Sequence, residues 1–166
     1  MGGTRLPVGD WAALADPPKS FTLSETTISD TTLVLDGAAG TVQRIDATFA
    51  PGSGEEFGLI VRGVGVQGTR VGIRPGEDSL VVDRRESGIT DFHETFPSCD
   101  SAPIQRLDGG YHLTIFVDHC SVEVFAQGGQ VTMTELIFPA DTSTDVAVYA
   151  TGGTATVNHL QITQVA

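Results

Sequence analysis

The stretch Leu113–Phe138 reads LTIFVDHCSVEVFAQGGQVTMTELIF and decides the fold. Apolar and polar residues alternate on both sides of Asp118-His119, and alternation with period two is typical of β-strands with one buried face. A two-residue turn at Asp118-His119 predicts a hairpin in which Val117 faces Cys120. This register places six apolar residues on one face: Leu113, Ile115, Val117, Cys120, Val122 and Val124. The opposite face then carries Thr114, Phe116, Ser121, Glu123 and Phe125. A slip of the register by one residue would move every apolar side chain to the opposite face. The clean separation of apolar and polar residues therefore favours this register.

Gly128-Gly129 predicts a second turn in the same stretch. A two-residue turn there would place the carboxylate of Glu135 opposite Val122, which belongs to the apolar face. We therefore expect a bulge, or a longer loop, between Ala126 and Thr134.

The rest of the chain alternates short strand-like runs with Gly-, Pro- and Asp-containing turns, and it offers almost no helix. One segment, Glu86–Leu107, exceeds normal loop length. Strands are expected at Ser20–Glu25, Thr32–Asp36, Val42–Ala50, Phe57–Val64, Arg70–Arg74, Ser79–Arg84, His112–Val117, Cys120–Ala126, Val131–Phe138, Val146–Ala150 and Ala155–Thr163. About eleven such strands predict an all-β protein, a two-sheet antiparallel β-sandwich.

Two ordered blocks resemble a known family. FVDHCSVEVFAQGG at 116–129 is followed by TELIFP at 134–139, and LVVDR at 80–84 is followed by Ser87-Gly88, Phe92 and Phe96. Both are similar to the C-terminal β-sandwich module of glycoside hydrolase family 32, which includes invertases, levanases, inulinases and fructosyltransferases. The resemblance implies a lectin-like jelly roll over residues 20–166. It implies that residues 1–19 form a linker from an absent catalytic domain. Within this linker, a cap at Asp10 and a stop at Asp16-Pro17-Pro18 predict a short helical turn at Trp11–Ala15.

The resemblance also bears on catalysis. Family enzymes are retaining glycosidases whose Asp nucleophile and Glu acid lie in a five-bladed propeller. The family motifs Trp-Met-Asn-Asp-Pro-Asn-Gly, Arg-Asp-Pro and Glu-Cys do not occur in this sequence. We therefore expect no catalytic residue, metal or cofactor here, and a module that packs on and stabilises the propeller of a β-fructofuranosidase, levanase or fructosyltransferase. The alternative is a fructan-binding module, since the similar family 66 carbohydrate-binding modules grip terminal fructose units of levan.

Candidate sugar-binding residues lie in the two blocks: Asp83, Arg84, Arg85, Glu86, Asp118, His119 and Glu123. Carboxylates and guanidinium groups supply the paired hydrogen bonds that neighbouring sugar hydroxyls need. In a continuous strand, successive side chains point to opposite faces, so the side chains of residues 83–86 could not all reach one ligand. Ser87-Gly88 indicates that the strand ends at this point, which removes the restriction. A structural hypothesis stays open beside this one: Asp83, Arg84 and Glu123 form a buried ion-pair network, so that Glu123→Ala would cost roughly 3–5 kcal/mol.

Charge restricts the partners. The chain carries 9 Lys and Arg against 21 Asp and Glu, a net charge of −12. Such acidity argues against nucleic acid and anionic membrane partners and suits a secreted protein that meets neutral sugars. The two cysteines, Cys99 and Cys120, are expected either as small buried residues or as one disulfide that ties the loop after Phe96 to the Asp118 hairpin.

Overall fold

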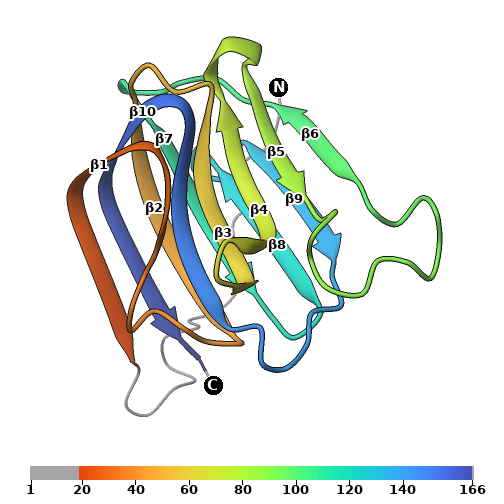
Figure 1. Cartoon of the computed structure of the whole chain (residues 1–166). Helices are drawn as coiled ribbons and strands as arrows, with labels where there is room; N and C mark the ends of the chain where they lie inside the picture. Colours follow the sequence, from red (N-terminus) through yellow and green to blue (C-terminus); the bar gives the residue numbers. More distant parts are fainter. Residues whose placement is uncertain (1–18, 166) are drawn as a thin grey trace.

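The computed structural model describes residues 19–165, and these form an antiparallel β-sandwich with one short 3-10 turn, η2 (Pro75–Glu77) (Figure 1). This confirms the all-β, two-sheet, lectin-like prediction. Within the described residues no helical segment has the length and apolar character needed to cross a bilayer. The strands are β1 (Ser20–Val34), β2 (Gln43–Pro51), β3 (Glu56–Val64), β4 (Gln67–Arg74), β5 (Ser79–Asp83), β6 (Cys99–Pro103), β7 (Tyr111–Val117), β8 (Ser121–Ala126), β9 (Val131–Leu136) and β10 (Asp145–Gln164).

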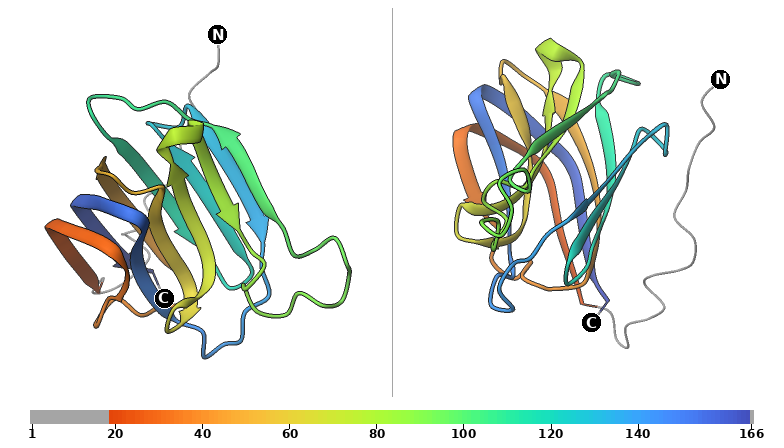
Figure 2. Two further views of the ribbon diagram at one scale, coloured as in Figure 1. Left: turned by 45° about the horizontal axis from the view of Figure 1, so that its top comes forward. Right: turned by 90° about the vertical axis from the view of Figure 1, so that its right-hand side faces the viewer.

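The two layers share strands β1 and β10. The first sheet runs β6-β5-β4-β3 and continues into the first half of β10, whereas the second sheet runs from the second half of β10 through β2-β7-β8-β9. Strand β1 pairs with β10 along both halves. The right-hand view in Figure 2 shows the two layers facing each other.

The bend between the sheets lies at Gly152-Gly153. Both glycines have positive φ, and the carboxylate of Asp30 accepts hydrogen bonds from their N–H groups at 2.7 and 3.3 Å. The predicted strands 146–150 and 155–163 are therefore parts of the two halves of β10. The predicted strands 20–25 and 32–36 both fall on β1, except that β1 ends at Val34. The glycines bend the strand without ending it, because the paired strand β1 bulges at the same place.

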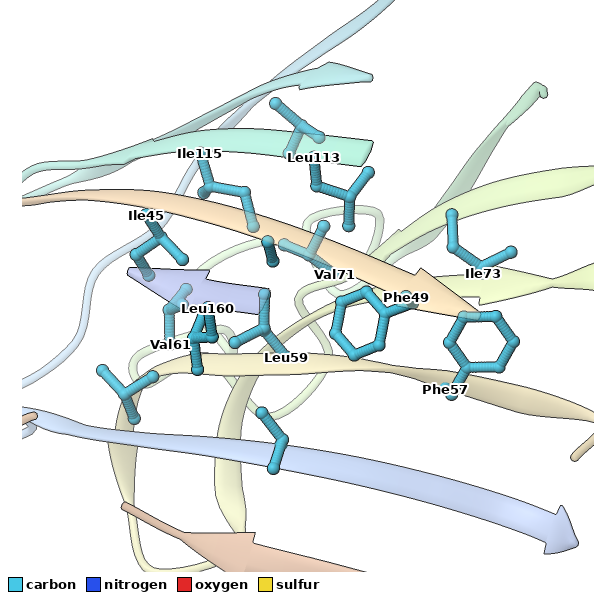
Figure 3. Close-up of a cluster of buried hydrophobic side chains, with 14 of the residues drawn as sticks. Ile45, Phe49, Phe57, Leu59, Val61, Val71, Ile73, Leu113, Ile115 and Leu160 are labelled. Atoms are coloured by element: carbon cyan, nitrogen blue, oxygen red, sulfur yellow. The ribbon is translucent and has the colours of Figure 1, made fainter. Parts of the chain in front are cut away.

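Apolar side chains from both sheets fill the space between the layers. Phe49 and Phe57 contact each other with ring centroids 5.5 Å apart, and they extend the aliphatic cluster that the alternating positions of β2, β3, β4 and β7 create (Figure 3). The predicted inward residues of the hairpin all belong to this core except Cys120. Burial of one face of each strand therefore holds the sandwich together.

The β7–β8 hairpin has the predicted faces but not the predicted register. Val117 pairs with Val122, not with Cys120, and three residues, 118–120, connect the two strands instead of the predicted two. The carboxylate of Asp118 accepts a hydrogen bond from the His119 N–H at 2.6 Å, and the Asp118 N–H donates to the Ser121 carbonyl at 3.0 Å. A shift by two residues preserves the side-chain faces, so only the turn prediction is wrong.

Of the two alternatives predicted between Ala126 and Thr134, the bulge is wrong and the longer loop is present. Pairing between β8 and β9 is uninterrupted across the four-residue connection 127–130, and Glu135 does stand opposite Val122. The carboxylate is accommodated because Arg84, from the other sheet, approaches it to 3.2 Å. Strands β6 and β9 are the edge strands of the two sheets, and we call the place where these edges meet the seam. An inward charge on β9 can therefore be paired across the seam by a residue of the other sheet.

Strand β6 lies inside the segment predicted to be irregular. Its sequence CDSAP has no apolar alternation, yet it pairs with β5 from Cys99 to Pro103. The remaining loop, 84–98, extends beyond the edge of the sandwich (green, at the right of Figure 1).

Both expectations for the cysteines are wrong: each is a free thiol, and Cys99 is half-buried whereas Cys120 is exposed in the hairpin turn. The helical turn expected at 11–15 lies outside the described residues.

Candidate functional site

Strand β5 ends at Asp83, and the charged residues that follow gather beside the outer face of the first sheet. Along β4, Val71 and Ile73 face the core, so Arg70 and Arg74 face outward. A pocket of about 420 Å³ opens there. Its lining comes from β3, from β4 and from the end of β5: Glu56, Gly68, Arg70, Arg74, Asp83, Arg85 and Glu86. We call it the charged pocket.

Asp83 and Arg85 form a bidentate pair in one wall of the charged pocket. The guanidinium donates to the two carboxylate oxygens at 2.9 and 2.6 Å, and the Arg85 N–H donates to the same carboxylate at 3.0 Å. Burial of Asp83 would raise its pKa, but the hydrogen bonds from Arg85 outweigh this effect and the pKa is lowered. Asp83 is therefore a fixed anion that orients its neighbour.

Glu56 joins two more residues at the base of the pocket. One carboxylate oxygen accepts from the Tyr149 hydroxyl at 2.7 Å, and the other accepts from Nε of Arg74 at 2.7 Å. Burial, followed by the charge of Glu56, raises the pKa of Tyr149. The absence of a side chain at Gly72 makes room for this contact, since a Cβ there would lie 2.3 Å from the Tyr149 oxygen.

Arg70 and Glu86 are the lining residues best able to engage a ligand. Within residues 19–165, neither makes a side-chain hydrogen bond or an ion pair, and Arg70 only rests over the ring of Tyr149 at 5.0 Å. Our sequence prediction missed Arg70, Arg74 and Glu56. A signal for Arg70 exists: a hairpin around Pro75–Asp78 places it directly opposite Asp83, as the structure does.

Arg84 points away from the charged pocket. Its guanidinium lies 4.1 Å from the centre of the Phe96 ring, donates to Ser98 Oγ at 3.0 Å and to the Leu136 carbonyl at 3.1 Å, and pairs with Glu135. Of the four consecutive residues predicted to bind sugar, Asp83, Arg85 and Glu86 thus share one pocket. Arg84 belongs instead to the seam between β6 and β9.

The other three predicted residues do not line the pocket. The backbone carbonyls of Asp118 and His119 accept hydrogen bonds from Arg62 at 3.3 and 3.1 Å. Glu123 is exposed on the outer face of β8 and forms no ion pair in the part of the chain that is described. The hypothesis of a buried network of Asp83, Arg84 and Glu123 is therefore wrong: the seam pairs Arg84 with Glu135.

We expect Glu123→Ala to change the free energy of unfolding by less than about 0.5 kcal/mol, the usual range for an exposed position. Arg84→Ala should lose about 2–3 kcal/mol, since it leaves Glu135 without its cation and removes the contact with Phe96. Urea denaturation of both variants tests this contrast. A larger loss for the Glu123 variant would contradict the exposed placement.

Two carboxylates meet at the seam. Burial raises the pKa of Glu135 above its usual 4.5, and a hydrogen bond with Asp100 of β6 and the charge of Asp100 raise it further, although Arg84 opposes the shift. Ser98 also donates to the Asp100 carboxylate at 2.8 Å. The folded state therefore holds the Glu135 proton more tightly than the unfolded chain does.

This arrangement predicts a pH dependence. Because the pKa of Glu135 is raised on folding, its contribution to stability is complete below 4.5 and is lost as the pH rises through the folded pKa. Asp100→Asn removes the neighbouring charge and should stabilise the domain by about 1 kcal/mol at pH 7, with a gain that shrinks on acidification. Denaturation curves at several pH values test this; a gain that grows toward low pH would contradict it.

An exposed apolar surface borders the seam. Ile89, Phe92 and Phe138 are 62%, 57% and 40% exposed. The rings of Phe92 and Phe96 lie 4.6 Å apart, Phe138 contacts both at 5.5 and 5.6 Å, and the Ile89 N–H donates to the Phe138 carbonyl at 3.0 Å. We call these four residues the aromatic surface. A contiguous exposed patch of large apolar side chains is typical of an interaction site.

Metal-binding chemistry finds no support in the described part of the chain, where no group of three or more His, Cys, Asp or Glu side chains could hold a metal ion. Cys99 lies beside the charged pocket, 3.9 Å from Arg74, and burial, with Asp83, raises the pKa of its thiol. A thiol with a raised pKa is a poor nucleophile at neutral pH.

The fold and the charged pocket define a lectin-like β-sandwich domain with a polar, ligand-sized pocket. Residues 10–164 match the family model described as "Glycosyl hydrolases family 32 C terminal". The chain therefore belongs to this family of C-terminal domains, and the resemblance stated from the two sequence blocks is confirmed.

Named relatives agree. The chain is 39% identical over 132 residues to a levanase of Bacillus subtilis. The aligned residues make up 78% of this chain and 20% of that levanase. It is 34% identical over 137 residues to an extracellular exo-inulinase of Aspergillus awamori, covering 80% and 24%. A crystal structure of exo-inulinase from A. awamori superposes with a TM-score of 0.88 at 27% identity, over 98% of this chain and 32% of that one. The chain thus spans only about a fifth to a third of the proteins it matches.

Proposed function

We propose that this domain is a non-catalytic part of a secreted fructan-hydrolysing enzyme, and that it packs on the enzyme's catalytic propeller through the aromatic surface. The exposed side chains of Ile89, Phe92 and Phe138, packed around half-buried Phe96, carry the proposal, because burial of such side chains stabilises an interface. The relatives named levanase and extracellular exo-inulinase support fructan as the substrate of the whole enzyme and secretion as its fate.

The test compares surface variants in the full-length parent enzyme. Phe92→Ser combined with Phe138→Ser should lower the thermal midpoint of the enzyme and split its unfolding into two transitions, since the domains no longer stabilise each other. The matched control is Leu33→Ser, which removes a side chain of similar exposure, 42%, from β1. In the isolated domain both changes should be mild. An intact single transition in the double variant would overturn the proposal.

A second function is favoured by the charged pocket: binding of a terminal fructose unit of a fructan. Its volume of about 420 Å³ lies in the range of small-ligand sites, roughly 300–1,000 Å³. Arg70 and Glu86 provide donors and acceptors that are not engaged elsewhere in residues 19–165, and Asp83 and Arg85 hold the wall in place. Few contacts to a small polar ligand give weak binding, in the micromolar to millimolar range.

Calorimetric titration with levan, inulin and sucrose tests this second function. Arg70→Ala and Glu86→Ala should each abolish measurable heat with levan, whereas Arg106→Ala, which removes an exposed arginine outside the pocket, should leave it unchanged. Absence of heat with the wild-type domain would leave only the packing function. Retained binding in both pocket variants would place the sugar elsewhere.

A further inference from the structure

We infer a second sugar-binding site, on the outer face of the second sheet, where the turn 107–110 folds toward the ends of β2 and β7. A groove of about 350 Å³ lies there. It is separate from the charged pocket, with which it shares no lining residue. The lining comprises Thr48, Leu107, Asp108, Gly109, Gly110, Tyr111, His112, Gln127, Gly128 and Asn158. We call it the turn groove.

The walls of the turn groove are held by one buried glutamine. Gln127 is 7% exposed and has a positive φ of 52°. Its side-chain oxygen accepts from the His112 N–H at 2.8 Å, and its side-chain nitrogen donates to the carbonyls of Gln105 at 2.6 Å and Gly110 at 3.2 Å. All polar atoms of its amide are thus used to join β7, the segment 105–110 and the β8–β9 connection. The groove is therefore preorganised before any ligand arrives.

The rim of the turn groove presents several polar side chains from different elements. Thr48 and His112 are directly opposed on the outward side of β2 and β7. The register shift in β10 between Val157 and His159 inserts Asn158 beside them, and bulges commonly redirect a side chain in this way. With Asp108 from the turn, these side chains make no hydrogen bond within residues 19–165.

The chemistry of this rim suits a neutral sugar. An amide, a hydroxyl, an imidazole and a carboxylate offer both donors and acceptors at short spacing, as an array of sugar hydroxyls requires. Leu107, 42% exposed, supplies an apolar contact for the C–H face of a sugar ring. An anionic ligand would meet Asp108 on a chain of net charge −12, with neither Lys nor Arg in the lining. The inference of a neutral-sugar site rests on the lining residues alone. Only the choice of fructan-type sugars as probes rests on the proposed function of the domain.

Nitrogen-15 correlation spectra of the isolated domain test the inference by titration with an inulin-type trisaccharide, a levan-type trisaccharide and maltotriose. At least one of these sugars should shift the resonances of His112, Asn158 and the Gln127 side-chain amide. Asn158→Ala and His112→Ala should weaken that binding about tenfold each, as expected for the loss of a hydrogen bond or two. His159→Ala, which changes the neighbouring exposed residue outside the groove, should not weaken it.

The outcomes separate the two sites. Shifts that survive Arg70→Ala but not Asn158→Ala support the turn groove, whichever sugar causes them; binding of maltotriose alone would support the groove while removing the case for fructan. Sugar binding at the turn groove would be overturned by shifts confined to Arg70, Glu86 and their neighbours, or by the absence of any shift with all three sugars. The spectra also report whether each variant is folded.

Discussion

Arg62→Met should lower the free energy of unfolding by about 3 kcal/mol. Arg62 is 2% exposed and its burial lowers its pKa, so the guanidinium is held by hydrogen bonds and not by solvent. It donates to four carbonyls on two separate segments: Ser143 at 2.8 Å, Ala140 at 3.1 Å, His119 at 3.1 Å and Asp118 at 3.3 Å. Methionine fills similar space but donates to none of these carbonyls, of which, within residues 19–165, only that of Ala140 keeps a second donor, the Ser143 N–H at 2.9 Å.

Two of these bonds, those to the carbonyls of Asp118 and His119, explain why this corner is built as it is. They tie β3 of the first sheet to the β7–β8 turn of the second, so the corner serves the fold. Arg106→Met is the matched control, since Arg106 is exposed and makes no hydrogen bond among the described residues. Chemical denaturation of both variants measures the difference. Equal stabilities would show that the buried guanidinium contributes nothing net.

Gly88→Ala should cost roughly 2–4 kcal/mol and loosen the 84–98 loop. Gly88 has a φ of +126°, and a Cβ there would lie 2.4 Å from the Phe138 carbonyl oxygen and 2.6 Å from Cα of Pro139. Both are backbone atoms, so the contact cannot be relieved by a side-chain rotation. The loop would have to move away from the end of β9 and carry Phe92 and Phe96 with it.

Gly109→Ala separates the cost of backbone strain from the cost of the steric contact that the new Cβ makes in Gly88→Ala. Gly109 also has a positive φ, +79°, but a Cβ there meets nothing within 4 Å. It should therefore cost only the backbone strain, about 1 kcal/mol. Denaturation curves give the stabilities, and limited proteolysis reports loosening of the loop, which we expect for Gly88→Ala alone. Similar cleavage of both variants would contradict the close contact.

Alternation identified the faces of the strands because side-chain direction depends only on whether a position is odd or even. The two-residue error at the Asp118 hairpin therefore left every core assignment intact except Cys120. Turn length was not readable in the same way, since it depends on the hydrogen bond between the Asp118 carboxylate and the His119 N–H. Local polar contacts of this kind compete with the favoured two-residue turns.

The candidate site was predictable in part, and for a similar reason. Asp83, Arg85 and Glu86 follow the end of a strand, and a cluster of charge at a strand end is visible in the sequence. Arg84 was misplaced because its partner, Glu135, lies on a strand of the other sheet. That contact depends on how two sheet edges meet, which no spacing along the chain encodes. Glu56 was missed because its role depends on Tyr149, which is 93 residues away.

The pairing of β1 with β10 has a mechanical consequence. Ser20 stands opposite Thr163, and the Gln164 N–H donates to the Lys19 carbonyl at 2.8 Å, so both ends of the described domain emerge side by side. Tension applied to these ends would open the ladder one rung at a time from its terminus, instead of shearing many hydrogen bonds at once. The domain should yield to pulling at a lower force than its thermal stability would suggest, and a neighbouring domain attached through either end is anchored at the same corner.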